Sequence, residues 1–245
     1  MTTPEFDAEA FFGDDYLYFF ADDLEERSDA ETDLIWQLLA LRPGMEVLDL
    51  ACGHGRIANR LARRGCRVTG LDSTELFLDR GRRDAAERGV AVEYVRGDMR
   101  RLPWRDQFDA IINWFTAFGY FDDAGNQQVL AQASAALRPG GRLALEMAHY
   151  LRLLRDYQPA VAVERNGDLV VDQHHLDPLT GRIVATRTYL RGGVSRRANY
   201  SVRIFSYTEL RDWLRAAGFT EVAGYGGDGQ ALTAESRRMI VIADR

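Results

Sequence analysis

The feature that most constrains this chain is a short apolar run that ends in two glycines. Residues 46–50, which include the β-branched Val47, have the composition of a buried strand, and Gly53 and Gly55 follow directly. Glycines allow the backbone to turn tightly before the next helix begins. The pattern therefore predicts a strand, a turn and a helix, with backbone N–H groups at the start of the helix directed at a bound small molecule.

Two classes of cofactor bind to a turn of this kind. Residues 53–58 formally fit the dinucleotide pattern G-x-G-x-x-G/A, and Asp72 follows about 20 residues later. Asp49, however, stands before the turn, where a carboxylate would repel a pyrophosphate but would support a ligand that carries an ammonium and a sulfonium group. The chain also has no lysine, which excludes the Tyr-x-x-x-Lys pair of short-chain dehydrogenases. These features favour the sulfonium ligand over a nicotinamide dinucleotide.

At these residues the sequence resembles the class I methyltransferases that use S-adenosylmethionine. Asp49, Gly53 and Gly55 fit the family pattern of an acidic residue followed by x-x-x-G-x-G, and Asp72 closes the next predicted strand as the family's second acidic residue does. The resemblance continues in the family's order over about 100 residues, through residues 97–99, 108–113 and 137–141.

The resemblance implies an α/β fold, a Rossmann-like seven-stranded methyltransferase sheet with helices on both faces. We expect residues 29–150 and 206–245 to form this core, with a separate helix over 29–41 that ends before Pro43. Extended runs and turn signals, among them Asn166-Gly167, predict that residues 151–205 form a small antiparallel β insertion after the fifth strand. Such an insertion would either cover the acceptor or form the face of a homodimer.

Residues 1–28 mix aromatic and acidic side chains, and two interpretations remain open. The segment is either a helix packed on the domain edge or a lid over the cofactor. In the second case a ring near the sulfonium would gain cation–π attraction, and Tyr16 is the candidate.

The resemblance also assigns cofactor contacts to individual residues. Asp72, with Ser73 beside it, would accept hydrogen bonds from the ribose hydroxyls, although Asp72 could instead cap the helix at 74–88. Asp98 would take the adenine amine, although it could instead cap the turn at 99–103. The full set of expected cofactor-binding residues is Tyr16, Asp49, Ala51, Gly53, Gly55, Asp72, Ser73, Asp98, Met99 and Asn113.

The aromatic loop after the strand at 108–113 is expected to face the acceptor with Phe118 and Tyr120. A neutral amine acceptor needs no protein base, whereas a hydroxyl acceptor would benefit from one. His149, just beyond the fifth strand, is the candidate base, although each histidine could equally be structural. We expect no metal, because no Cys or acidic partner stands at metal-ligand spacing from a histidine.

Composition limits the partners. The formal net charge is −6 and the pI about 5.3, so no broad basic field is available for a nucleic acid. Residues 113–116 read Asn-Trp-Phe-Thr where enzymes that methylate adenine or glutamine nitrogen have an Asn-Pro-Pro-Tyr type motif. Two cysteines do not suggest a disulfide framework, and no apolar run approaches membrane-spanning length. The sequence thus favours a cytoplasmic bacterial protein without a membrane or nucleic-acid partner.

The expected activity is methyl transfer from S-adenosylmethionine to an O or N atom of a small-molecule acceptor, with release of S-adenosylhomocysteine. Two alternatives stay open: a protein or RNA methyltransferase, and a subunit that binds S-adenosylmethionine without catalysis.

Overall fold

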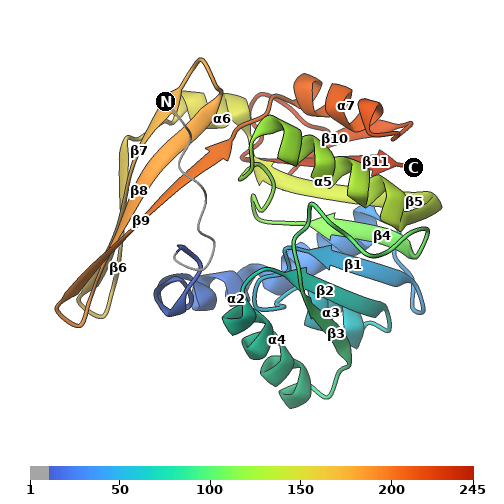
Figure 1. Ribbon diagram of the computed structural model, residues 1–245, viewed down its shortest axis with the longest axis horizontal. Coiled ribbons are helices and arrows are strands. Elements are labelled where there is room, and N and C mark those ends of the chain that lie inside the picture. Colours follow the sequence, from blue (N-terminus) through green and yellow to red (C-terminus); the bar gives the residue numbers. More distant parts are fainter. Residues whose placement is uncertain (1–10) are drawn as a thin grey trace.

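The computed structural model describes residues 11–245, so the first ten residues of the expected lid segment lie outside the described residues. Two sheets make up the molecule, one of seven strands and one of four. Figure 1 shows the four-stranded sheet beside the seven-stranded one, with helix α2 (Asp14–Leu38) running from below the smaller sheet to the larger.

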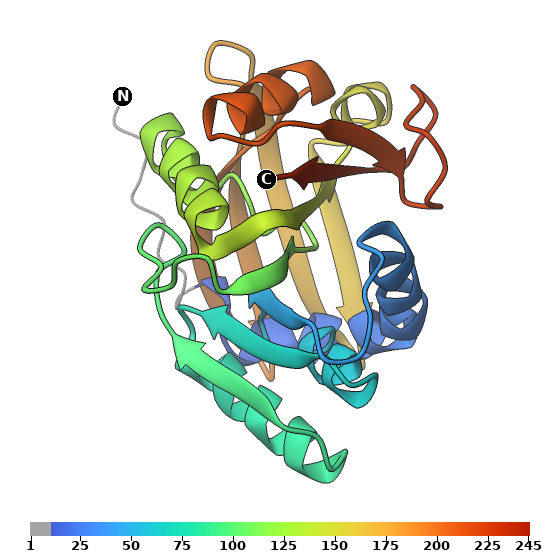
Figure 2. The ribbon, with the colours of Figure 1, turned by 90° about the vertical axis from the view of Figure 1, so that its right-hand side faces the viewer.

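The large sheet has the predicted seven strands. Strand β1 pairs in parallel with both β2 and β4, so the strand order reverses direction at β1. Strand β11 pairs antiparallel with β5, and β10 antiparallel with β11. Figure 2 shows the order β10-β11-β5-β4-β1-β2-β3 from the red end of the chain to the green. The strands are β1 (Glu46–Leu50), β2 (Arg67–Asp72), β3 (Val92–Arg96), β4 (Phe108–Asn113), β5 (Leu137–Ala148), β10 (Val222–Gly226) and β11 (Arg238–Asp244).

Helices cover both faces of this sheet, as predicted. Because side chains alternate along a strand, Leu48 and Val47 of β1 belong to different apolar clusters. Leu48 lies in the cluster of α5 and α7, and Val47 in the cluster of α2 and α3. The remaining helices are α3 (Ala58–Arg63), α4 (Glu75–Glu87), α5 (Asp123–Ala136), α6 (Tyr150–Arg155) and α7 (Tyr207–Ala216).

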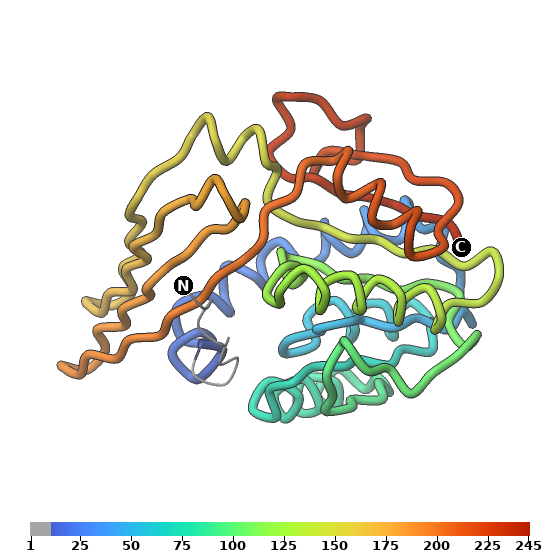
Figure 3. Tube along the Cα trace, turned by 45° about the horizontal axis from the view of Figure 1, so that its top comes forward, coloured from blue at the N-terminus to red at the C-terminus, as the bar shows by residue number. Residues whose placement is uncertain are grey.

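The small sheet is the predicted antiparallel insertion. Its strands are β6 (Ala160–Arg165), β7 (Asp168–Asp177), β8 (Arg182–Arg191) and β9 (Val194–Arg203), and they pair in chain order. Asn166 and Gly167 both have positive φ, at 52° and 83°, which is the conformation that a tight hairpin between β6 and β7 requires. Figure 3 shows the chain leaving the large sheet after β5 and returning from β9 to α7.

The separate helix expected over 29–41 is not observed. Helix α2 runs unbroken from Asp14 to Leu38, so the expected boundary between lid and core falls inside it. No glycine or proline interrupts residues 14–41. The hydroxyls of Ser28 and Thr32 donate back to backbone oxygens within the helix, each over 2.6 Å, so they are satisfied where they are buried. One helix therefore connects the region beside the insertion to the flank of the large sheet.

Candidate active site

The glycine turn after β1 is built from residues in the left-handed conformation. Ala51, Gly53 and Gly55 have φ values of 60°, 57° and 75°. At Gly55 a Cβ atom would lie 1.8 Å from the Tyr94 hydroxyl oxygen, so this position has no room for a side chain. The N–H of Cys52 donates to the Leu71 carbonyl oxygen over 3.0 Å and ties the turn to the end of β2.

Asp72, at the end of β2, joins this turn to the next one. Its Oδ2 accepts a 2.8 Å hydrogen bond from the Gly53 N–H, and its Oδ1 accepts a 2.9 Å hydrogen bond from the Thr74 N–H. Thr74 is the N-cap residue of α4. Burial raises the pKa of Asp72 above its usual value, although the backbone hydrogen bonds from Thr74 and Gly53 oppose this shift.

Asp49 is a buried acid next to the same turn. It is only 3% exposed and forms no ion pair within residues 11–245. Burial raises its pKa to about 7; the positive charge of Arg56 opposes the shift and the charge of Asp72 adds to it. A cationic ligand beside Asp49 would favour the ionised carboxylate. The residues at this turn therefore fit a ligand that carries positive charge.

A cavity of about 610 Å³ opens in front of these turns. It runs along the carboxyl ends of strands β1, β2, β3 and β4, and it reaches the start of α2 and the insertion. Eight of the ten expected cofactor-binding residues line it, namely Tyr16, Asp49, Ala51, Gly53, Asp72, Ser73, Asp98 and Met99.

Two expected cofactor residues and the expected base do not line the cavity. Gly55 is packed against Tyr94, as described above. Asn113 is fully buried, and its Nδ2 donates to the Leu50 carbonyl oxygen over 2.8 Å, which holds the end of β4 to β1. His149 lies after β5, and its Nδ1 is 2.8 Å from the carbonyl oxygen of Ser236, in the loop before β11. His149 therefore contacts the loop before β11 and does not line the cavity.

Asp98 carries a negative charge at the end of the cavity near β3. The guanidinium of Arg100 donates to both of its oxygens, and the Arg100 N–H donates over 2.8 Å. Burial raises the pKa of Asp98, but the hydrogen bonds from Arg100 outweigh burial and lower it overall. The carboxylate is thus an ionised acceptor beside Met99. The Arg100 N–H bond also makes Asp98 the cap of its own turn, so the two sequence interpretations are compatible.

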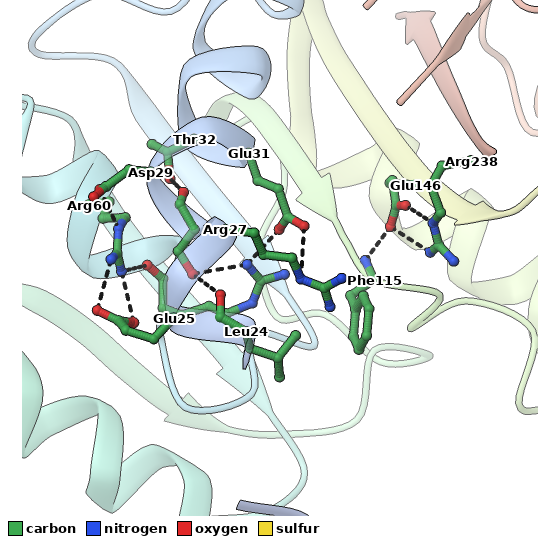
Figure 4. Close-up of polar contacts among 12 residues, drawn as sticks. Leu24, Glu25, Arg27, Asp29, Glu31, Thr32, Arg60, Phe115, Glu146 and Arg238 are labelled. Carbon is green, nitrogen blue, oxygen red and sulfur yellow. Dashed lines mark hydrogen bonds and ion pairs between the residues drawn. The ribbon is translucent and has the colours of Figure 1, made fainter. Parts of the chain in front are cut away.

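The sequence predicted an aromatic loop after β4, but it did not predict the conformation of Phe115 and Thr116 in that loop. Both residues have positive φ, 64° and 56°, which is costly for side chains of this size. The buried Glu146 holds the loop: its Oε2 accepts from the Phe115 N–H over 2.7 Å, and Arg238 forms an ion pair with the same carboxylate. Figure 4 shows Phe115 between this pair and helix α2, where the Arg27 guanidinium lies 4.4 Å from its ring. Nothing in the local sequence indicates this conformation.

Arg56 also lines the cavity and was not expected there. Its side chain is 7% exposed, pairs with Glu31 of α2 over 2.5 Å and donates to the Ser28 hydroxyl. Arg60, one turn on, pairs with Glu25 and Asp29 of the same helix (Figure 4). These pairs fix helix α2 against the glycine turn.

Aromatic rings form the wall at the start of α2. The Tyr16 ring lies 5.1 Å from Phe12, 5.1 Å from Phe20 and 5.7 Å from Phe77, measured between centroids. Burial raises the pKa of Tyr16 to about 12, so its hydroxyl stays protonated. Tyr120 lines the cavity as expected, whereas Phe118 does not: it packs in the core, 5.3 Å from the Phe205 ring.

Among residues 11–245 no group of three His, Cys, Asp or Glu side chains is placed to hold a metal ion. Within the same range, no helix has both the length and the apolar character needed to cross a membrane.

Known proteins share both the sequence pattern and the fold of this chain. Residues 47–141 match the methyltransferase domain family. The chain is 30% identical over 200 residues to the ubiquinone/menaquinone biosynthesis C-methyltransferase of Cereibacter sphaeroides, a match that covers 79% of this chain and 71% of the relative. It is 26% identical to the CcbJ methyltransferase of Streptomyces caelestis, whose structure superposes with a TM-score of 0.72 over 89% of this chain and 94% of that one. The chain belongs to the class I S-adenosylmethionine-dependent methyltransferases.

Other relatives align over a shorter region. Over 130 residues the chain is 29% identical to an uncharacterized protein of Mycobacterium tuberculosis, and the match spans half of this chain and 46% of that one.

Proposed function

We propose that this protein transfers a methyl group from S-adenosylmethionine to an oxygen or nitrogen atom of a small-molecule acceptor and releases S-adenosylhomocysteine. The observation that carries the proposal is the continuity of the cavity. The same cavity is lined by Asp49, Gly53 and Asp72 at one end and by Arg187 and Tyr200 of the insertion at the other. Cofactor and acceptor would share it, and a cavity of this size is typical of small-ligand sites.

The expected cofactor contacts follow the lining residues. Asp72 accepts a backbone N–H bond on each oxygen, and because it also lines the cavity it would accept hydrogen bonds from the ribose hydroxyls. Asp98 and Met99 would contact adenine. Asp49 and the ring of Tyr16 would lie toward the positively charged part of the cofactor, which supplies an electrophilic methyl group when bound.

The insertion, residues 151–205, takes the role of acceptor cover in this proposal. The inner face of its sheet contributes Arg187 and Tyr200 to the cavity wall. The homodimer through the insertion stays a prediction. Seven of the eight exposed large apolar side chains of the described chain belong to the insertion, namely Leu151, Leu154, Val161, Leu169, Leu179, Leu190 and Val194. Light scattering of the purified protein would test whether it forms this dimer.

In this proposal the residues that line the cavity act mainly by holding the cofactor and the acceptor in position. His54 is the histidine of the described cavity wall, and burial, followed by the charge of Arg56, lowers its pKa to about 4, so it is neutral but weakly basic at pH 7. Burial raises the pKa of Tyr16 and Tyr200 to about 12, and both keep their protons. The wall therefore favours an acceptor that is already nucleophilic, such as a neutral amine or an ionised oxygen, and methyl transfer by alignment.

The two alternatives predict other results. A protein or RNA methyltransferase needs an open surface for a large substrate, whereas residues of α2 and of the insertion line the cavity here. A subunit without catalysis would bind the cofactor and leave it unchanged.

Turnover tests the proposal. The purified protein is incubated with S-adenosylmethionine and a panel of phenols, carboxylates and amines, and mass spectrometry follows S-adenosylhomocysteine and the methylated product. We expect product with at least one small molecule and none without an acceptor. Tight cofactor binding without turnover on the whole panel, together with methylation of added protein or RNA, would overturn the small-molecule assignment.

A further inference from the structure

Arg187 is a buried charged residue on the side of strand β8 that faces the cavity. Along β8 the side chains of Ile183, Ala185, Arg187 and Tyr189 alternate with more exposed ones, so all four face the same side of the sheet. Arg187 is only 8% exposed, and it lines the cavity. A guanidinium is rarely buried so far unless partners surround it.

One carboxylate satisfies only part of this guanidinium. Asp172 is the cross-strand partner of Arg187 in β7. Its Oδ1 accepts from Nε over 2.7 Å and its Oδ2 from Nη2 over 2.6 Å, which is the bidentate geometry of a strong pair. The third nitrogen, Nη1, is buried and makes no hydrogen bond of standard geometry with the residues that the structure describes, and the Tyr189 hydroxyl lies near enough to the guanidinium to interact with it. Leaving such a donor buried and unpaired is unfavourable, so the geometry points to a ligand atom that accepts from it.

The surroundings of Arg187 are flat and aromatic. Its guanidinium carbon lies 4.5 Å from the ring centroid of Phe11, 5.0 Å from Phe20 and 5.7 Å from Tyr200. The Tyr189 hydroxyl is close by and donates to the Phe11 carbonyl oxygen over 3.1 Å. Phe11 and Tyr200 line the cavity together with Arg187. The rings of Phe11 and Tyr200 are in contact, with centroids 4.6 Å apart, and form one wall. A planar ring packs against such a wall better than a hydrated, flexible chain.

The charges of the cavity favour an anion at this end. The lining carboxylates of the described chain lie at the strand ends where the cofactor contacts are expected, and Asp172 is not among the lining residues. Nearby Asp15 is occupied by Arg191 and Arg196, over 3.1 and 2.9 Å. An ammonium group placed beside Arg187 would therefore be repelled by the guanidinium, and no carboxylate that lines the cavity lies beside it to offset the repulsion. In total, five arginines and three aspartates line the cavity: Arg56, Arg96, Arg100, Arg187, Arg238, Asp49, Asp72 and Asp98.

We propose that Arg187 is a specificity-determining residue that binds the acceptor through a carboxylate, with Nη1 donating to a carboxylate oxygen and the acceptor's aromatic ring packed against the wall that Phe11 and Tyr200 form together. The substrate class is thus an aromatic carboxylic acid. This inference rests on the proposed function, because it places the acceptor in the part of the cavity that the insertion covers.

The test measures binding, so that it does not depend on turnover. The probes are 2-naphthoate and its neutral analogue 2-naphthamide, each titrated calorimetrically into the protein saturated with S-adenosylhomocysteine. We expect naphthoate to bind at least tenfold tighter than naphthamide. Equal affinity, tighter binding of the amide, or no binding of either probe would overturn the inference.

Variants identify the residue responsible. Arg187→Met should weaken naphthoate binding at least tenfold and leave naphthamide nearly unchanged, and Arg187→Lys should restore part of the preference. Arg197→Met is the matched control, because Arg197 lies on the outer, exposed side of β9. Naphthoate binding that survives in Arg187→Met would contradict the assignment.

Two further measurements keep the outcomes separate. The double variant Asp172→Asn with Arg187→Met removes both charges, so it reports on the site even if the single variant unfolds because Asp172 is left unpaired. Binding of S-adenosylhomocysteine is measured in parallel for every variant. A wild-type protein that binds the cofactor but shows no naphthoate preference overturns this inference alone, whereas a wild-type protein that does not bind the cofactor overturns the proposed function.

Discussion

The backbone N–H of Gly53 donates to Oδ2 of Asp72 over 2.8 Å. This bond connects the turns that follow β1 and β2, and the second oxygen of Asp72 holds the N–H of Thr74. One carboxylate therefore organises both loops, and it also lines the cavity. The role expected of Asp72 at the ribose and its alternative role near the start of α4 are compatible.

Replacing Asp72 tests the ribose contact. We expect Asp72→Ala to weaken S-adenosylmethionine binding by about 1.5–3 kcal/mol, because hydrogen bonds to a charged group are lost. Calorimetry would measure this as a dissociation constant roughly 10- to 100-fold higher. Asp33→Ala is the control, since Asp33 is an exposed acid that pairs with Arg64 and does not line the cavity. An unchanged constant in Asp72→Ala would remove Asp72 from the cofactor site.

Gly55 is expected to be required for packing. In Gly55→Ala the new Cβ would meet the Tyr94 hydroxyl oxygen at 1.8 Å, in addition to the strain of a φ of 75°. Gly140→Ala is a matched control with a φ of 78° and no atom within 4 Å. The control should lose about 1 kcal/mol of unfolding free energy and Gly55→Ala about 1–3 kcal/mol more, measured by urea denaturation. Equal losses would mean that the contact with Tyr94 relaxes at no cost.

Cofactor binding should release a proton near neutral pH. The pKa of Asp49 is about 7 in the free protein, chiefly because of burial, and a bound cation favours its ionised form. Affinity should therefore rise as the pH increases from 6 to 8 and then level off. Calorimetry at pH 6.5 in buffers of different ionisation enthalpy would detect the released proton, and Asp49→Asn should remove both effects. Proton uptake would contradict the position given to the cofactor's positive charge.

The same group makes the stability of the free protein depend on pH. Because the folded-state pKa of Asp49 is raised, its contribution to unfolding free energy is fully present below about pH 4 and is lost as the pH rises through 7. Over this range Asp49→Asn should gain stability relative to the wild type by about 2–4 kcal/mol, the linkage value for a shift of this size. Denaturation at pH 5 and pH 8 gives the difference, and a gap that stays constant would rule out a raised pKa.

Local patterns made the core of the fold and much of the cavity wall predictable. Asp49, Gly53 and Asp72 lie within or just after short apolar strands, and parallel strands bring their ends to one edge of the sheet. Residues at those strand ends therefore lie beside one cavity. The insertion was also predictable, because Asn166-Gly167 and the alternation along its strands are local signals.

Features that depend on distant contacts were not predictable. Phe115 adopts its strained conformation because Glu146 of another strand accepts from its N–H. His149 follows a strand end, as a catalytic residue would, but the chain places the Ser236 carbonyl oxygen against it. Arg187 has a sequence signal, an arginine in the inward phase of a strand between Ala185 and Tyr189. Its meaning depends on which face of the insertion meets the large sheet.

The unbroken helix α2 shows a related limit. A change in composition near residue 28 suggested two segments, yet the chain has no residue there that ends a helix. The charged pairs of Arg56 and Arg60 with acids of α2 fix this helix in place, and partners 25 to 35 residues apart along the chain carry no local pattern.

Calorimetry with two ligands tests the central claim most directly. The purified protein is titrated with S-adenosylmethionine and, separately, with a nicotinamide dinucleotide, in the wild type and in Asp72→Ala. We predict saturable heat with S-adenosylmethionine that weakens in the variant, and no heat with the dinucleotide. Binding of the dinucleotide without binding of S-adenosylmethionine would contradict the account.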